Sequence, residues 1–109
     1  MSRYLCVVFH VENGTESFSI DRNNRFIQEM TTNECKTIQT IKTIRIKTSY
    51  DKAAIILFMK LVQDRIKYDD ISDILVLCDL MAISIHCKIY TITERLKEYI
   101  STFYTYKCT

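Results

Sequence analysis

The chain of 109 residues contains no proline, no tryptophan and only one glycine, Gly14. A glycine-rich loop of the kind that cradles phosphate groups in nucleotide-binding proteins is therefore excluded. Long apolar runs are missing as well, because the most apolar segment is interrupted by aspartates and is shorter than the ~20 residues that a membrane-spanning helix requires. We accordingly expect neither a phosphate-binding loop nor a membrane span.

Neither sign of charge predominates in the sequence. The 15 basic and 13 acidic residues give a formal net charge of +2, which is too balanced to predict binding to nucleic acid or to an anionic membrane. Hydrophobic residues make up 48% of the chain, which excludes a disordered protein. The length predicts a single domain over residues 1–109, with a modest hydrophobic core.

The cysteines show neither the spacing nor the even number of a disulfide framework or a metal site. No apolar leader typical of a secretory signal is visible, so we interpret the cysteines as reduced thiols of a cytoplasmic or nuclear protein. Ligands clustered at defined spacing are missing, so we expect no metal and no cofactor. The five cysteines are Cys6, Cys35, Cys78, Cys87 and Cys108.

The two histidines, His10 and His86, do not indicate catalysis. His86 is next to Cys87, but a Cys/His nucleophile pair needs both side chains within hydrogen-bond reach and a third group that orients the base. Adjacent residues on a helix point in different directions, so this pair does not qualify. We interpret His86 as a surface or capping residue at the start of the last helix. The chain is therefore predicted not to be an enzyme.

The segment from Ser49 to Ile100 is the most informative part of the chain and predicts three consecutive helices. Its centre, Ile71–Ile83, is apolar on nearly every side, which is typical of a helix buried on all sides. Asp69 and Asp70 are expected to cap the N-terminus of this helix, where negative charge is favourable.

The flanking segments are amphipathic, as helices that cover a central one must be. Asp51–Arg65 carries a single apolar stripe, and Ser49 is a suitable N-cap for it. Ser84–Phe103 carries apolar residues on one face and charged residues on the other, which predicts one continuous last helix. The aromatic tail Ser101–Thr109 either folds back on the core or is a segment for a partner.

The N-terminal half predicts a small sheet. Arg3–Val11 is rich in valine and aromatic residues, Asn13-Gly14 is a hairpin signal, and Glu16–Asp21 alternates polar and apolar residues. Ile41–Thr48 alternates again and predicts a third strand. Arg22–Cys35 predicts one or two short helical turns.

The three polar residues from Thr31 to Asn33 are expected to interrupt those turns. The fold class is therefore α+β, with a small N-terminal β-sheet, made of a hairpin plus a third strand, packed against a cluster of α-helices.

Several of these segments resemble the BTB/POZ superfamily, which includes elongin C and the Skp-type adaptors. Leu77–Ile83 is similar to the buried-helix signature of that family, and Phe58–Val62 and Arg65–Tyr68 are similar to the helix and turn before it. Asn13-Gly14, followed by Phe18, resembles the opening hairpin. The resemblance covers about residues 4–100 and implies a short BTB/POZ-like domain. Two departures are the missing proline before the helix near residue 51 and a single helix where Skp-type adaptors have two.

The resemblance implies a non-catalytic adaptor of a cullin ubiquitin ligase, which links a cullin-type scaffold to a substrate-receptor helix. The alternative is a stand-alone BTB homo-oligomerisation module, or a viral decoy of such a pathway. Nucleic acid and membranes are not expected partners in either case. By matching position, the groove for the partner helix is formed by Val76, Leu80, Met81, Ile83, Ile85 and Ile89, a set that a plain hydrophobic core would also contain. The scaffold-facing candidates are Asp64, Lys67, Tyr68 and Asp69.

Overall fold

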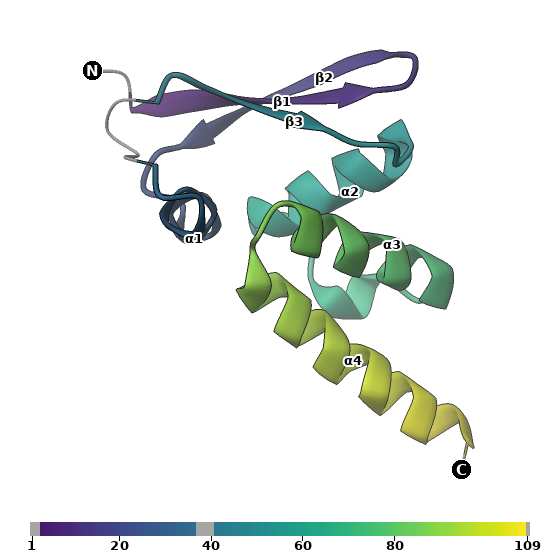
Figure 1. Ribbon diagram of the computed structural model, residues 1–109. Coiled ribbons are helices and arrows are strands. Elements are labelled where there is room, and N and C mark those ends of the chain that lie inside the picture. The colour runs from purple at the N-terminus through teal and green to yellow at the C-terminus, as the bar shows by residue number, and fades with distance from the viewer. Residues whose placement is uncertain (1–2, 37–40, 109) are drawn as a thin grey trace.

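The computed structural model describes residues 3–36 and 41–108, with side chains up to residue 102. Within these residues a three-stranded sheet lies at one end of the molecule, and four α-helices extend from it on one side (Figure 1). This arrangement confirms the α+β fold class. The elements in chain order are β1 (Tyr4–Val11), β2 (Gly14–Asp21), α1 (Arg25–Asn33), β3 (Thr43–Lys47), α2 (Lys52–Val62), a 3₁₀ turn (Tyr68–Asp70), α3 (Ile74–His86) and α4 (Tyr90–Cys108).

The sheet has the strand order β2-β1-β3, with an antiparallel β1–β2 pair and a parallel β1–β3 pair. The hairpin turns at Gly14, whose φ of +145° is a backbone conformation that other residues rarely adopt. Val7 is paired with Phe18 on one side and Ile44 on the other, so the inward-facing residues of the three strands lie in register. The three predicted strands are confirmed. Their alternation places Ile44 in the core and leaves Arg45 exposed.

Helix α1 runs without interruption through the residues that were expected to break it. Asn24 caps the helix, because its side-chain oxygen accepts hydrogen bonds from the backbone N–H groups of Phe26 and Ile27. Thr31 is buried, and its hydroxyl donates to the carbonyl of Ile27 at 3.0 Å. A threonine that hydrogen-bonds its own preceding turn is compatible with a helix interior. The predicted break at residues 31–33 is therefore wrong.

Helix α2 starts at Lys52, next to the predicted Asp51, whereas α3 starts at Ile74 instead of the predicted Ile71. Asp51, not Ser49, caps α2 by accepting from the N–H of Ala54 at 2.9 Å. Asp73 caps α3 by accepting from the N–H of Leu75 at 2.9 Å. Asp69 and Asp70 therefore do not cap α3 but belong to the 3₁₀ turn before it. There Asp70 accepts from the backbone N–H of Lys67.

Helices α1, α2 and α3 all end with a residue in the left-handed conformation: Cys35 (φ 57°), Asp64 (φ 56°) and Lys88 (φ 60°). In each case the next N–H bonds back to the helix, as Ile89 does to the carbonyl of Ser84 at 2.9 Å. Glycine is the usual residue at this position of a helix end. Because the chain has no glycine after α3, the sequence does not indicate where this helix ends.

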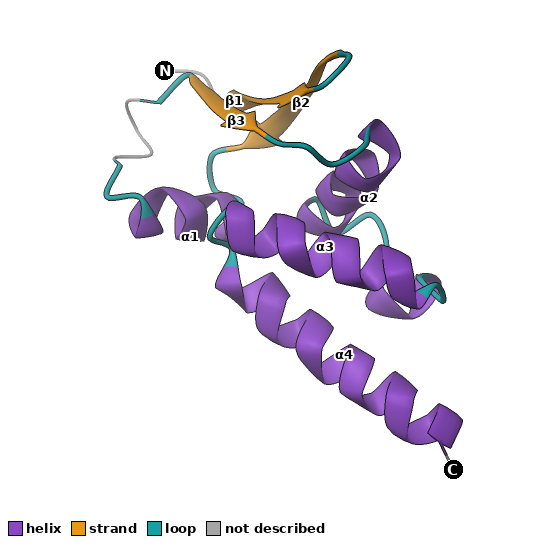
Figure 2. Ribbon diagram, turned by 45° about the vertical axis from the view of Figure 1, so that its right-hand side comes forward, coloured by secondary structure: helices purple, strands orange, loops and turns teal. Residues whose placement is uncertain are grey.

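The predicted continuous helix from Ser84 to Phe103 is thus wrong. Helix α3 continues to His86, the chain turns at Lys88, and α4 starts at Tyr90. The Asn33 side chain donates to the carbonyl of Lys88 at 2.8 Å and fixes this turn against α1. Figure 2 shows that α4 then runs away from the sheet, and the molecule measures 52 Å along its longest axis. The backbone of the aromatic tail continues α4 to Cys108, whereas its side chains from residue 103 lie outside the described residues.

The core lies between the inner face of the sheet and the helices, as one continuous cluster of buried side chains. Helix α3 contributes Leu77 and Leu80, which have no solvent-accessible surface, and α4 contributes Ile92 and Leu96. The hydroxyls of Ser84 and Thr93 lie 2.6 Å apart, and this buried hydrogen bond joins α3 to α4. The largest fully buried side chains are Phe9, Phe58, Ile27, Ile55, Met59, Leu77, Leu80, Ile83, Ile89, Ile92, Leu96 and Val7.

Candidate interaction surface on helix α3

One face of α3 is open to solvent, although the sequence predicts a helix buried on all sides. Leu75 is 73% exposed and Ile85 is 51% exposed, and Cys78 and Asp79 are also exposed. The prediction of full burial is therefore wrong. One side of α3 stays open because the helix packs mainly against α2 and α4, which cover its other sides. The chain itself does not supply a cover for this open side within the described residues.

The exposed apolar residues of α3, together with the partly exposed Ala82, follow a regular spacing. Leu75, Cys78, Ala82 and Ile85 are separated by three, four and three positions, so they form a stripe along one side of the helix. We call these four residues the α3 stripe. It extends over roughly 15 Å at 1.5 Å per residue. The small side chains of Cys78 and Ala82 lie between the larger Leu75 and Ile85, so another helix can approach closely at its centre.

Negative charge is concentrated in the N-terminal half of α3 and in the turn before it. Asp79 lies on the same face, one helical turn after Leu75 and one turn before Ala82. No lysine or arginine occurs between Tyr68 and Cys87. Four exposed aspartates occur in this segment, and none of them forms an ion pair with another described residue. They are Asp69, Asp70, Asp73 and Asp79.

The residues predicted for the partner-helix groove are not all at the surface. Leu80, Ile83 and Ile89 are at most 1% exposed and pack inside the core. Val76 and Met81 are partly buried against that core. Ile85 is the member of the predicted set that is mostly open to solvent. The predicted set does not include Leu75, Cys78 and Ala82, the other members of the α3 stripe, because apolar residues on the other sides of the helix hide their spacing in the sequence.

The predicted scaffold-facing residues lie in one surface segment between α2 and α3. Asp64 follows the C-cap of α2, and its carboxylate lies 3.3 Å from the guanidinium of Arg25, an exposed pair that contributes little to stability. Lys67 and Asp69 are exposed. Tyr68 is half-buried, and burial raises the pKa of its hydroxyl. Tyr68 and Asp69 border a shallow hollow of about 280 Å³ beside α4.

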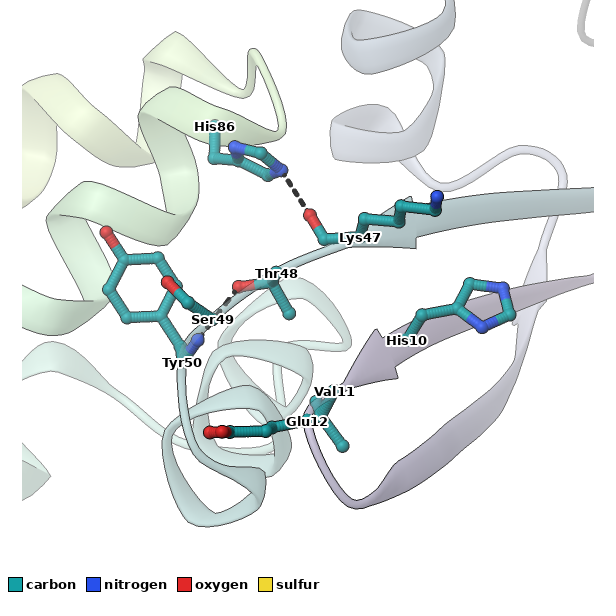
Figure 3. A pocket seen from close by; sticks show the side chains of 8 residues that line it. All are labelled: His10, Val11, Glu12, Lys47, Thr48, Ser49, Tyr50 and His86. Carbon is teal, nitrogen blue, oxygen red and sulfur yellow. Dashed lines mark hydrogen bonds between the residues drawn. The ribbon is translucent and has the colours of Figure 1, made fainter.

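Both histidines border a second hollow, of about 600 Å³, at the end of the sheet (Figure 3). His86 is the last residue of α3 rather than the first of a later helix, and its Nε2 lies 2.7 Å from the carbonyl oxygen of Lys47. In Figure 3 the ring of His10 points away from His86, so the two imidazoles do not converge on a shared ligand. The hollow is lined by His10, Val11, Glu12, Lys47, Thr48, Ser49, Tyr50 and His86.

The described residues do not assemble a reactive centre around the cysteines. Cys87 is buried, and burial raises the pKa of its thiol to about 12, so it stays protonated and unreactive at neutral pH. The four cysteines whose side chains are described form no disulfide with one another. Among the same residues, no three histidine, cysteine, aspartate or glutamate side chains are grouped to hold a metal ion. No helix in the described ranges has the length and hydropathy needed to cross a membrane.

Comparisons with known proteins leave the family of the chain open. No family model matches the sequence, and neither a curated protein nor a solved structure matches the chain. The function must therefore be argued from the surface itself, on which the α3 stripe contains the most exposed large apolar side chain among the described residues, Leu75.

Proposed function

We propose that the chain is a non-catalytic interaction adaptor that receives a helix of another protein on the α3 stripe. The observation that carries this proposal is the 73% exposure of Leu75 and the 51% exposure of Ile85 on a helix whose inner side lies in the core. Apolar side chains aligned on an exposed face are typical of a protein–protein contact. A partner helix would bind in the helix-in-groove mode, with its apolar residues at positions i, i+3, i+4 and i+7.

The proposed adaptor is of the elongin C and Skp type and belongs to a ubiquitin ligase complex in the cytoplasm or nucleus. Support for this comes from the sequence resemblance between Phe58 and Ile83. In this proposal, the segment from Asp64 to Asp69 contacts a cullin-type scaffold, and the α3 stripe contacts the receptor helix. The two surfaces are on different segments, so substitutions can separate them.

Self-association is the second candidate function, and the side-chain sizes in the α3 stripe favour it. The order large, small, small, large is the same in both directions along the helix. Two copies of α3 in antiparallel orientation would therefore place Leu75 opposite Ile85 and Cys78 opposite Ala82 of the other copy. A two-fold symmetric dimer needs a self-complementary patch of this kind.

The solution mass and the captured proteins distinguish these two functions. We expect the purified chain to be a monomer at micromolar concentration and to capture a cullin-type scaffold and a receptor from a lysate of cells that express it. Leu75→Glu should remove the receptor, whereas a joint substitution of Asp64 and Tyr68 should remove the scaffold. Tyr90→Glu is the matched control, because Tyr90 is 47% exposed on α4 but lies outside the stripe.

A tight homodimer that dissociates in the Leu75→Glu variant, with no cullin captured, would replace the adaptor by a self-association module. A monomer whose captured proteins do not change in the Leu75→Glu variant would contradict the role of the α3 stripe in either function. Circular dichroism of each variant shows whether a lost contact reflects a lost fold.

A further inference from the structure

The charges of the aspartates in α3 differ from those of acidic residues that form ion pairs elsewhere in the chain. Asp21 is 2.8 Å from Arg3, and Asp64 is 3.3 Å from Arg25, so their charges are compensated within the molecule. Asp73 at the N-terminal end of α3 and Asp79 in its middle have no such partner among the described residues. A helix that covers the stripe brings its own side chains close to this uncompensated negative charge.

We propose that the helix received by the α3 stripe is amphipathic and basic, with lysine or arginine side chains beside Asp73 and Asp79. This inference rests on the proposed function and specifies the chemistry of the partner. Charges at the rim of an interface mainly set partner choice and association rate, because they are screened by salt and remain partly hydrated. The apolar stripe supplies the contact, and the aspartates select among the helices that could make it.

The position of the charges also sets the orientation of the partner. The aspartates lie at the N-terminal end and the middle of α3, whereas His86 and Lys88 lie at its C-terminal end. The basic half of the partner therefore lies beside the N-terminal half of α3. Lysine and arginine are most favourable in the last turn of a helix, where they interact with its dipole. An antiparallel partner satisfies both conditions, because its C-terminal turn lies beside Asp73 and Asp79.

The test uses three designed peptides labelled with a fluorophore. The first has leucines at helical i, i+3, i+4 and i+7 positions and lysines on its flanks in the C-terminal half. The second has glutamate at each lysine position. The third contains the residues of the first in an order without helical periodicity. Fluorescence anisotropy at two salt concentrations measures the binding of each peptide to the full chain and to its Leu75→Glu, Asp79→Lys and Tyr90→Glu variants.

We expect the basic peptide to bind about tenfold more tightly than the acidic one at low salt, which is the effect of about two favourable surface charge pairs. Asp79→Lys should abolish or reverse this preference, because it changes the sign of the charge beside the stripe. Leu75→Glu should prevent binding of both helical peptides, and Tyr90→Glu should change neither. The preference should shrink as salt increases.

Equal affinities for the basic and acidic peptides would overturn the inference about charge and leave the proposed docking surface intact. Binding of the non-periodic basic peptide as tightly as the helical one would overturn it as well, because the attraction would then be unspecific. If neither helical peptide binds, the inference is wrong. The capture experiment with Leu75→Glu then decides separately whether the stripe docks a protein, and a dimer that depends on Leu75 would identify a second copy of the chain as the occupant.

Discussion

The two sides of helix α3 carry the same kinds of residue in opposite environments. Leu77, Leu80 and Ile83 on the inner side are at most 1% exposed, whereas Leu75 and Ile85 on the outer side are more than half exposed. The inner residues are covered by α2 and α4 of the same chain. The hydrophobicity of a helix therefore indicates how much of its surface should be buried. It does not indicate whether the same chain or another molecule buries that surface.

The largest expected difference between the two sides is in the cost of truncating a leucine. Leu80→Ala should lower the free energy of unfolding by ~2–5 kcal/mol, because it removes buried methyl groups and leaves a cavity. Leu75→Ala should change it by less than about 0.5 kcal/mol, as expected for an exposed site. Urea denaturation of the two variants and of the native chain measures both values. Equal losses would mean that the outer side is covered in solution.

The sequence predicts which residues face inward in the sheet, but it does not predict the difference between the two sides of α3. The alternation that predicts the third strand also separates the buried Ile44 from the exposed Arg45, because a period of two assigns each residue to one face of the sheet. Helix α3 offered no such period, since Val76, Leu77 and their neighbours are apolar on every side. The open face depends on where α2 and α4 pack, which is a tertiary property that local pattern does not contain.

The ends of the helices were hidden for a different reason. Sequence signals for helix ends rely on glycine and proline, and this chain has one glycine and no proline. Cys35, Asp64 and Lys88 take the left-handed position instead, at a steric cost that the surrounding hydrogen bonds offset. The predicted site was affected directly. Continuing the last helix back to Ser84 placed Ile85 and Ile89 on one face, whereas the turn at Lys88 puts Ile85 outside and Ile89 inside.

A smaller effect is expected for the two aspartates of α3. Asp73→Ala removes the side chain that accepts from the N–H of Leu75 and should lower the free energy of unfolding by about 1 kcal/mol. Asp79→Ala removes an exposed charge without a described partner and should change it by less than about 0.5 kcal/mol. Thermal denaturation of both variants gives the comparison, with Asp73→Ser as the control that keeps a capping oxygen. A loss of the same size in Asp69→Ala would place the start of the helix earlier, near Ile71.

An effect of similar size, limited to alkaline pH, concerns two thiols of α3, that of Cys78 on the outer side and that of Cys87 at the C-terminal end. Burial raises the pKa of Cys87 to about 12 in the folded chain from an ordinary value of 9.0. Because the folded-state pKa is the higher one, the stabilising contribution is complete below about pH 9 and is lost as pH rises toward 12. Between pH 8 and pH 10 the native chain should lose about 1 kcal/mol of unfolding free energy that the Cys87→Ala variant keeps.

Cys78 provides the matched control on the outer side, because its thiol is exposed on the α3 stripe. Cys78→Ala should leave the pH dependence of the unfolding free energy as it is in the native chain. Under native conditions at pH 8, iodoacetamide followed by mass spectrometry should modify Cys78 and leave Cys87 unmodified until the chain unfolds. Parallel pH curves for the native chain and the Cys87→Ala variant would show that Cys87 is hydrated in solution. Rapid alkylation of Cys87 would show the same, and the inner side of α3 near its C-terminus would then be as open as the outer side.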